Sequence, residues 1–468
     1  MLQLLLVLTA VPAIPSASEL QANLDAAIAA GAATFAVPAG TYNFSTANFN
    51  VFGATHGLRL LAAGATALFH GTSGVNVTNC ADLHVSGLTI DYASPEPHGR
   101  RGVPGITYNV WNSTRVTSED VTILRAPFFA VTAFNGGGGH VFRRFRLPSG
   151  TADPGPCPYR HQRDAFHFSD LRQGVTLEDS DAADFGDDFF NSHNTIMLAL
   201  AVEEEEEEEE EGPAGQPRTS ALLINPHLQN VRTGRNTVYG TNCVLENLRG
   251  GDRLTFFAPI NGSSDISAAA AFAPVPRSGS CAVRGVTERV RDAAVLAAAA
   301  ALGANFSRSY FTEDFDASDV WRVRFAAPLP AAVVAGSLVN VDSFSTPGTV
   351  IRNNTFTNTR YNLGRFKSAG GAIVNNSFSR AGAHNLEITP LLQYFEGPVL
   401  VRDVTVAGNT FAGVGATPVH CSPFCNPKTC PYGNCSKCPD CARDYSPWAT
   451  NTTVRDNTFL EGPEAQRT

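Results

Sequence analysis

The stretch DFGDDFFNSH, residues 184–193, places two adjacent carboxylates, Asp187 and Asp188, between a glycine and an apolar pair. A third carboxylate, Asp164, lies upstream in RDAFHFSD, 23 residues before Asp187. Three carboxylates brought together resist full ionisation, so one of them should keep its proton near neutral pH. Such a set could supply the general acid and the general base that hydrolysis of a glycosidic bond requires. The alternative is a group of ordinary turn residues, because Asp is common at turns.

Other polar residues are candidates for contacts with a substrate at such a site. If the chain is extended at RDAFHFSD, His167 points to the opposite side from Phe166 and Phe168. The same alternation puts both cations of the segment GRFK on one face. The predicted substrate-binding residues are His167, His193, Arg365, Lys367 and Glu396, with Glu387 as a further groove residue. Structural histidines and solvated charges remain the alternative for all of them.

The carboxylates need an architecture that brings residues about one repeat apart into contact. Four related segments, RNNTFTNT, VNNSFSRA, AGNTFAGV and RDNTFLEG, place Phe at positions 356, 378, 411 and 459. The first interval is 22 residues, and insertions at one corner would explain the longer ones. Short alternating runs rich in Val, Ile and Thr separate these segments, with no helix long enough for a crossover. This pattern predicts an all-β parallel β-helix solenoid, although a β-sandwich with chance Asn-x-Phe turns is the alternative.

The front half shows the same units less regularly. Segments 81–92, 118–127, 139–149 and 173–190 each have the pattern of strand, turn and strand. One turn of such a solenoid would place Asp164 beside the Asp187–Asp188 pair at the strand spacing of about 4.8 Å. An amphipathic stretch that starts at ELQANLDAAIAA should form a helix capping the first turn.

The chain therefore divides into several predicted regions. Residues 1–18 resemble a signal peptide, with a buried strand or short helix as the alternative. Residues 19–249 form the N-terminal part of the β-helix, including a disordered Glu-rich loop at 203–217. Residues 250–345 lose the Asn-rich repeat and are predicted to be an inserted small β domain or a long excursion. Residues 346–468 complete the solenoid and carry a Cys-rich insert at 420–441.

Six of the ten cysteines lie in this Cys-rich insert. An even set of closely spaced cysteines in an exported chain favours disulfides, although Cys435 to Cys441 with His420 could also bind zinc. The other four cysteines are scattered, and Cys157 could form a bridge with another of them.

Composition bounds the cellular setting and the partners. Nine of the 43 acidic residues form the run 203–211, and the remaining acidic residues equal the 34 Lys plus Arg in number. A neutral bulk charge favours neither nucleic acid nor an anionic membrane as a partner. No segment of the mature chain approaches the length of a membrane span. Together with nine Asn-x-Ser/Thr sequons, these features predict a secreted or cell-surface glycoprotein.

The run RDAFHFSD…GVTLEDSDAADFGDDFFNSH resembles parallel β-helix glycosidases, most closely the family-110 α-1,3-galactosidases. It is more distantly similar to polygalacturonases, in which an Asp is followed one turn later by Asp-Asp. The segments GDRLTFF, TVIRNNTFTNTRYNLGRFKSAGGAIVNNSF and YFEGP look similar too, so the likeness covers roughly residues 75–412. The Glu run and the Cys-rich insert depart from it.

The resemblance implies a right-handed, pectin-lyase-like β-helix and an inverting, exo-acting glycosidase for a galactose-containing oligo- or polysaccharide. By position, Asp187 would match the general acid, and Asp164 and Asp188 the carboxylates that activate water. It implies no cofactor and no catalytic metal. An Arg-x-Lys pair, which meets the substrate carboxylate in polygalacturonases, could point to an acidic glycan. A polysaccharide lyase or uronate epimerase, or a non-catalytic glycan-binding protein, remain the alternative functions.

Overall fold

The computed structural model describes the following residues: 15–45, 47–71, 74–93, 106–149, 161, 163–205, 218–224, 243–259, 272–274, 280–285, 287–290, 292–295, 297, 320–381, 386–388, 396–398, 401–414, 419–420 and 449–460. Most of the predicted signal peptide and of the Cys-rich insert lies outside these residues.

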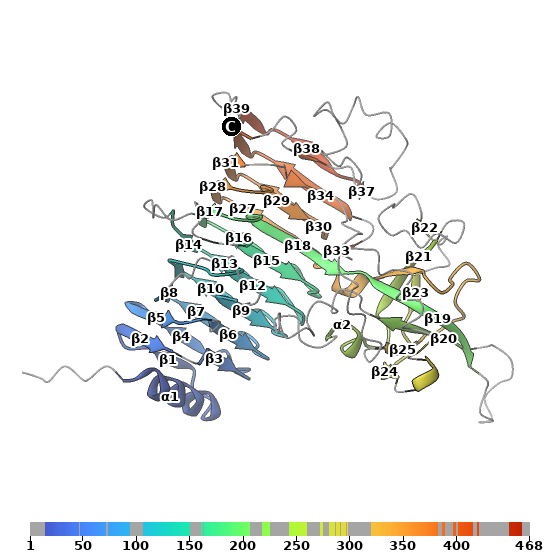
Figure 1. Cartoon of the computed structure of the whole chain (residues 1–468), viewed down its shortest axis with the longest axis horizontal. Coiled ribbons are helices and arrows are strands. Elements are labelled where there is room, and N and C mark those ends of the chain that lie inside the picture. The colour runs from blue at the N-terminus through green and yellow to red at the C-terminus, as the bar shows by residue number, and fades with distance from the viewer. Residues whose placement is uncertain are drawn as a thin grey trace, which may run out of the picture.

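Three long parallel sheets wind the described chain into a parallel β-helix (Figure 1). Sheet 1 contains β1 (Thr34–Ala36), β4 (Arg59–Leu61), β7 (His84–Ser86), β10 (Thr117–Glu119), β13 (Val141–Arg143), β16 (Thr176–Glu178), β27 (Thr349–Arg352), β30 (Ala369–Val374), β34 (Val401–Ala407), β37 (Ala449–Thr450) and β38 (Thr453–Arg455). Sheet 2 contains β2 (Gly40–Phe44), β5 (Ala65–Phe69), β8 (Thr89–Tyr92), β11 (Thr122–Ile123), β14 (Arg146–Leu147), β17 (Asp181–Phe185), β28 (Thr355–Thr359), β31 (Ser377–Ala381), β35 (Thr410–Ala412) and β39 (Thr458–Leu460). Sheet 3 contains β3 (Phe49–Phe52), β6 (Val75–Thr78), β9 (Tyr108–Trp111), β12 (Val131–Phe134), β15 (Phe166–Ser169), β18 (Phe190–Thr195), β29 (Gly364–Phe366), β32 (Leu386–Glu387) and β36 (Val419–His420).

Successive turns contribute neighbouring strands to each sheet, and the coil is right-handed, so the predicted solenoid is confirmed. The short strand β33 (Glu396–Gly397) is an exception, because it pairs antiparallel with β18.

Stacked rows of identical side chains fill the interior. The Phe residues of the four C-terminal repeats occupy equivalent positions in β28, β31, β35 and β39. Their rings stack with centroids 5.2–5.3 Å apart. The unequal sequence intervals are therefore absorbed at the corners, as the repeat predicted.

A ladder of amides lines the bend between sheets 1 and 2. Asn376 donates from Nδ2 to the Asn409 side-chain oxygen at 3.0 Å, and Asn409 makes the same bond to Asn457 at 2.9 Å. An amide suits such a row because it both donates and accepts, so identical neighbours satisfy one another. Asn353 and Asn375, each of which directly precedes an asparagine of the ladder, adopt a left-handed φ of 56°, which Asn tolerates better than most residues.

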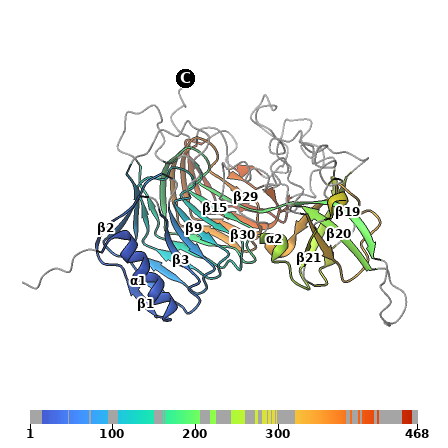
Figure 2. The same cartoon turned by 60° about the horizontal axis from the view of Figure 1, so that its bottom comes forward.

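The predicted capping helix is present as α1 (Ala17–Ala29), which lies across the first turn (Figure 2). Ser16 and Glu19 form a capping box at its start, and the buried Leu20 and Leu24 pack on the solenoid core. The predicted signal-peptide segment 1–18 thus overlaps the first helical turn. No helix in the described part of the chain is long and apolar enough to cross a membrane.

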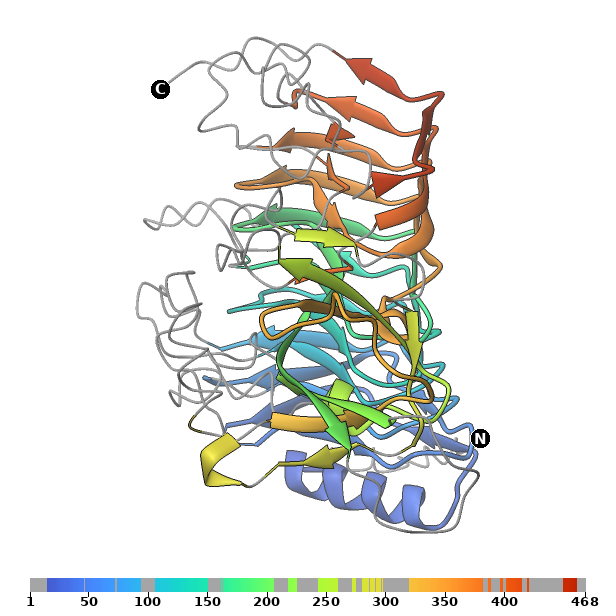
Figure 3. The same ribbon diagram turned by 90° about the vertical axis from the view of Figure 1, so that its right-hand side faces the viewer.

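The inserted β region is a fourth sheet beside the solenoid (Figure 3). It contains β19 (Met197–Glu205), β20 (Arg218–Ile224), β21 (Arg253–Pro259), β22 (Phe272–Pro274), β23 (Ser280–Ala282), β24 (Glu288–Arg289), β25 (Val320–Arg324) and β26 (Leu338–Val341). The helix α2 (Cys243–Glu246) lies between β20 and β21 in the sequence, and the 3-10 turn η7 (Asp342–Phe344) follows β26. Arg172 ties the insertion to the solenoid through two 2.7 Å contacts with Asp252.

The predicted boundary of the insertion was wrong. The insertion begins at Met197, directly after β18, rather than at residue 250. No Gly or Pro separates β18 from β19, so the sequence carries no turn signal at this boundary, which explains the error. The Glu-rich segment was also misassigned in part, because β19 continues through Glu205, whereas residues 206–217 lie outside the described residues.

Two of the scattered cysteines, Cys80 and Cys281, are buried free thiols. Neither therefore takes part in the predicted bridge to Cys157. Cys157 and the six cysteines of the insert lie outside the described residues, so the pairing predicted for the insert stays a prediction.

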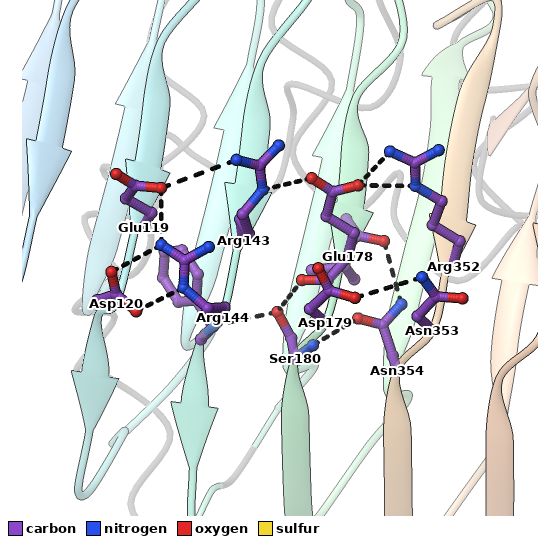
Figure 4. A network of polar contacts seen from close by, with 12 residues as sticks. Glu119, Asp120, Arg143, Arg144, Glu178, Asp179, Ser180, Arg352, Asn353 and Asn354 are labelled. Carbon is purple, nitrogen blue, oxygen red and sulfur yellow. Dashed lines mark hydrogen bonds and ion pairs between the residues drawn. The ribbon is translucent and has the colours of Figure 1, made fainter.

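Charges alternate along the outer face of sheet 1 (Figure 4). The equivalent positions of β10, β13, β16 and β27 carry Glu119, Arg143, Glu178 and Arg352. Glu178 is only 4% exposed and bonds both arginines, with Arg352 Nε at 2.7 Å. Because the insertion separates β16 from β27, this carboxylate joins the turns on its two sides.

We expect Glu178→Gln to lower the free energy of unfolding by about 1–3 kcal/mol, between the usual values for exposed and buried pairs. Chemical denaturation would measure the loss. Asp120→Asn, in the exposed pair with Arg144, is the matched control and should cost less than ~1 kcal/mol. An equal effect of the two substitutions would contradict this role of Glu178.

The stabilisation by Glu178 should also depend on pH. Burial favours the neutral acid, but the hydrogen bonds and charges of Arg352 and Arg143 outweigh it and lower the pKa of Glu178. A lowered folded-state pKa means that the contribution is present above the unfolded value of about 4.3 and is lost as pH falls through the folded value. The stability difference between parent and Glu178→Gln should therefore shrink below about pH 4.

Candidate active site

The register of sheet 3 brings the three carboxylates together. Phe166 of β15 pairs with Phe190 of β18, so one turn is 24 residues here. The Ala165 N–H accordingly donates to the Asp188 carbonyl at 3.0 Å. Asp164 thus lies beside the Asp187–Asp188 pair, as predicted, with Asp188 as its direct neighbour. Asp187 is instead one turn from Arg163.

All three carboxylates nevertheless converge at one place. One oxygen from each of Asp164, Asp187 and Asp188 lies within 4.8 Å of the other two. The Asp164 and Asp188 side chains are 5% and 2% exposed, whereas that of Asp187 is 21% exposed. The cluster therefore has one carboxylate that faces outward and two that are enclosed.

Burial gives the two enclosed carboxyls an unusual tendency to hold protons. Loss of solvation raises the pKa of Asp164 well above its ordinary value, and the charge of Asp187 raises it further. Loss of solvation also raises the pKa of Asp188, although Arg365 opposes the shift. Both shifts favour the protonated forms of these two carboxyls.

Two arginines contact the carboxylate cluster. Arg163 Nη1 lies 3.0 Å from Asp187 Oδ2. Arg365 Nε lies 3.3 Å from Asp188 Oδ2 and 3.1 Å from Glu387 Oε2. The backbone N–H of Asn362 also donates to Asp188 Oδ1, at 3.1 Å.

Lys367 and Glu396 form a buried ion pair next to this cluster. Lys367 is 1% exposed at its side chain and also donates to Asn191 Oδ1 at 3.0 Å. Burial alone would raise the pKa of Glu396, but the charges of Lys367, His193 and Arg365 hold it well below its ordinary value. Glu396 reaches this place because β33 lies beside the end of β18 (Figure 1).

The ion pairs and the raised pKa values together balance the charge of the site. Five carboxyls meet three cations, and each cation has a close partner: Asp187 with Arg163, Glu387 with Arg365, and Glu396 with Lys367. The two carboxyls left over are Asp164 and Asp188, whose pKa values are raised. With both protonated, the site carries equal numbers of positive and negative charges.

Two buried histidines extend from Asp164. His167 Nδ1 lies 2.7 Å from Asp164 Oδ2, and His167 Nε2 lies 2.9 Å from His193 Nε2. Burial lowers the pKa of His167 to about 4, so the ring is neutral at physiological pH. The site thus contains a continuous hydrogen-bonded row from Asp164 to His193.

Aromatic side chains that the sequence did not single out border the histidines. The rings of Phe129 and Phe134 lie 4.8 and 5.4 Å from the ring of His167. Arg163 lies over the ring of Phe128 at 5.5 Å. These residues form a small apolar cluster of their own outside the solenoid core, against which Trp111 also packs. The sequence signal available for this cluster was the adjacent pair Phe128–Phe129, which lies one turn before Arg163 and Asp164.

The eight predicted site residues therefore lie in one contiguous array. They are Asp164, Asp187, Asp188, His167, His193, Arg365, Lys367 and Glu396. Their catalytic and binding roles stay predictions. Sequence reasoning missed Arg163, Asn191 and Asn362. Arg163 lies one turn before Asp187, so the one-turn argument used for Asp164 could have found it too.

The carboxylate cluster has oxygens spaced closely enough for one cation to reach all three. Arg163 and Arg365 already bring positive charge to two of them. We therefore do not assign a metal to these residues.

Comparisons with known proteins establish no family for this chain. No family model matches it, and no curated protein matches it. Similar solved structures include the endo-xylogalacturonan hydrolase of Aspergillus tubingensis, at 9% identity and a TM-score of 0.34 over 95% of this chain and 90% of that one. A tailspike mutant of E. coli bacteriophage HK620 in complex with a pentasaccharide has 10% identity and a TM-score of 0.34, over 96% of this chain and 60% of that one. The A-module of a mannuronan C-5 epimerase of Azotobacter vinelandii has 10% identity and a TM-score of 0.25, over 96% and 95%. Similarity this low carries no argument about activity.

We expect Lys367→Met to destabilise the fold by about 3–5 kcal/mol, because it leaves the buried Glu396 carboxylate without its cation. The double variant Lys367→Met/Glu396→Gln should recover much of this loss. Chemical denaturation of the parent, both single variants and the double variant gives the coupling energy. Additive effects of the two substitutions would show that the pair is not coupled.

Proposed function

We propose that the protein is a secreted glycoside hydrolase that acts on a neutral, galactose-containing glycan by using Asp164, Asp187 and Asp188. The observation that carries the proposal is the convergence of the three carboxylates at unequal depth. Hydrolysis of a glycosidic bond needs one carboxyl that donates a proton and one carboxylate that accepts a proton from water. Unequal burial is the usual means of giving neighbouring carboxyls different protonation states.

Asp187 suits the role of general acid because it alone of the three has an appreciably exposed side chain. In the free protein Arg163 pairs with it, and the exposed side chain of this arginine leaves room for a substrate to reach Asp187 by displacing it. The proton can come from Asp188, which has an oxygen within the span of a single bridging water. Asp188 then serves as a carboxylate that activates the attacking water, and Asp164 is available as the second carboxylate once its own proton has left.

The surrounding charges favour a neutral sugar over a uronate. Arg365 is engaged by Asp188 and Glu387, and Lys367 is buried against Glu396. A substrate carboxylate would need to break these pairs and would meet the nearby acids. The acidic glycan suggested by the Arg-x-Lys pair is therefore disfavoured, whereas galactose itself rests on the resemblance alone.

The same pairing weakens the lyase and epimerase alternative. Those reactions need a cation that neutralises the substrate carboxylate and a base that removes a carbon-bound proton. The three cations of the described site, Arg163, Arg365 and Lys367, are already paired with acids. Loss of activity with a chelator would favour that alternative, through calcium held by the acids.

We expect Asp187→Asn to lower turnover by ~10²-fold or more, because an amide cannot donate a proton to the leaving oxygen. A panel of galactans and blood-group-type oligosaccharides supplies the substrates. Asp184→Asn is the matched control: Asp184 lies in the same turn, has a φ of 62° that Asn accepts, and bonds Asn358 rather than the cluster. Unchanged turnover in Asp187→Asn would refute the assignment.

We further expect the first-formed product to have the inverted anomeric configuration, observable by NMR during the initial turnovers. This expectation depends on the resemblance. The oxygens of the cluster lie within 4.8 Å, closer than the ~6.5–9.5 Å usual for inverting enzymes and nearer to the ~5–5.5 Å of retaining ones. Retention of configuration would thus contradict the resemblance while leaving the carboxylate assignment in place.

A further inference from the structure

The row Asp164–His167–His193 has a hydrogen-bonding pattern that restricts where its protons sit. His193 Nδ1 lies 3.1 Å from the Asn194 carbonyl oxygen and 3.5 Å from Ser169 Oγ. A carbonyl only accepts, and the Ser169 hydroxyl already donates to Asp170 at 2.7 Å. Both neighbours of this nitrogen are therefore acceptors, so His193 Nδ1 carries a hydrogen.

This assignment propagates along the row. If His193 is neutral, its Nε2 has no hydrogen and accepts one from His167 Nε2. A neutral His167 then has a bare Nδ1, which accepts from Asp164. The Asp164 carboxyl must be the protonated form in this arrangement, in agreement with its raised pKa and with the lowered pKa of His167.

A second arrangement has the same number of protons and the same total charge. The Asp164 proton moves to His167 Nδ1 while the His167 Nε2 proton moves to His193 Nε2. Asp164 becomes a carboxylate that accepts from His167, and His193 becomes an imidazolium that donates from both nitrogens. One O–H bond and one N–H bond break, two N–H bonds form, and no other reactant is needed.

We propose that Asp164, His167 and His193 form a proton relay that converts Asp164 from a neutral acid to a carboxylate base without exchange of a proton with solvent. The relay rests on the proposed function, because it supplies the base form of Asp164 that activates water there. His167 and His193 act through Asp164 and are not themselves catalytic residues.

The charged groups around the row suit both arrangements. Those that act on Asp164 or His167 are Asp187, Asp188, Arg163, Arg365, Lys367 and Glu396. Glu396 lies close enough to His193 for the two charges to interact, and so stabilises the imidazolium. Arg365 and Arg163 stabilise the Asp164 carboxylate. Charge separation along the row is thus compensated at both ends.

His193→Gln tests the relay, because an amide can accept a hydrogen bond from His167 but cannot take up its proton. Asp164 in this variant must lose its proton to solvent before it can act as a base. We expect the acidic limb of the kcat/KM profile to move to higher pH by about one unit or more, with at least a tenfold loss on that limb. His140→Gln, a buried histidine outside the site, is the matched control and should leave the limb in place. A His193→Gln profile with the same limb as the parent would overturn the relay.

The protonation states are readable without any substrate. Long-range ¹H–¹⁵N spectra of the histidine-labelled full chain identify which ring nitrogens carry hydrogen. We expect either His167 protonated at Nε2 with His193 neutral, or His167 protonated at Nδ1 with His193 cationic, and only the first form in His193→Gln. His167 protonated at Nδ1 beside a neutral His193 would overturn the relay. If no glycan is turned over, the proposed function fails while these spectra still decide whether the relay exists.

Discussion

Parallel pairing between successive turns places each side chain about 4.8 Å from the residue one turn away, and this constraint governs every layer of the solenoid. Inside the solenoid it is favourable, because Phe378 stacks on Phe411 and identical apolar groups pack well. At the bend between sheets 1 and 2 it is met by Asn376 and Asn409, whose amides satisfy their own kind. On the outer face of sheet 1, positive and negative side chains alternate from turn to turn, as in the row that contains Glu178 (Figure 4).

The carboxylate cluster is an exception, because residues of like charge are stacked there on adjacent turns. Asp164 and Asp188 are like charges stacked on adjacent turns and enclosed besides. The cost is reduced by keeping protons on both carboxyls, while three separate acids neutralise Arg163, Arg365 and Lys367. An arrangement that is unfavourable for stability, yet balanced in charge, is typical of a site selected for its chemistry.

Much of the fold could be predicted from the sequence because the repeated segments fix the length of each solenoid turn. The Asn-x-Phe segments set the turns, and the positions of Phe356 and Phe378 alone define one period. The same one-turn argument placed Asp164 beside the Asp187–Asp188 pair, as the structure has it. The argument left open which member of the pair is the direct neighbour of Asp164, because the pairing of Phe166 with Phe190 decides that it is Asp188.

The remainder depends on contacts that have no periodic signal. Met197 starts the inserted sheet within a run that looks like one more solenoid strand. Glu396 lies against Lys367 only because β33 turns back along β18 in the opposite direction. Such antiparallel returns are fixed by tertiary packing, and a sequence read one turn at a time gives no indication of them.

The position of the inserted sheet has a consequence for synthesis of the protein. Asp164 and Asp188 precede it in the chain, whereas Asn362, Arg365 and Lys367 follow it. The backbone N–H that donates to Asp188 belongs to Asn362, 174 positions further along the chain. A polypeptide emerging from the ribosome therefore displays Asp188 long before Arg365, its cationic partner, has been made. The first six turns can coil as they appear, but the finished electrostatic arrangement must wait until the inserted sheet has been made and the seventh turn has docked.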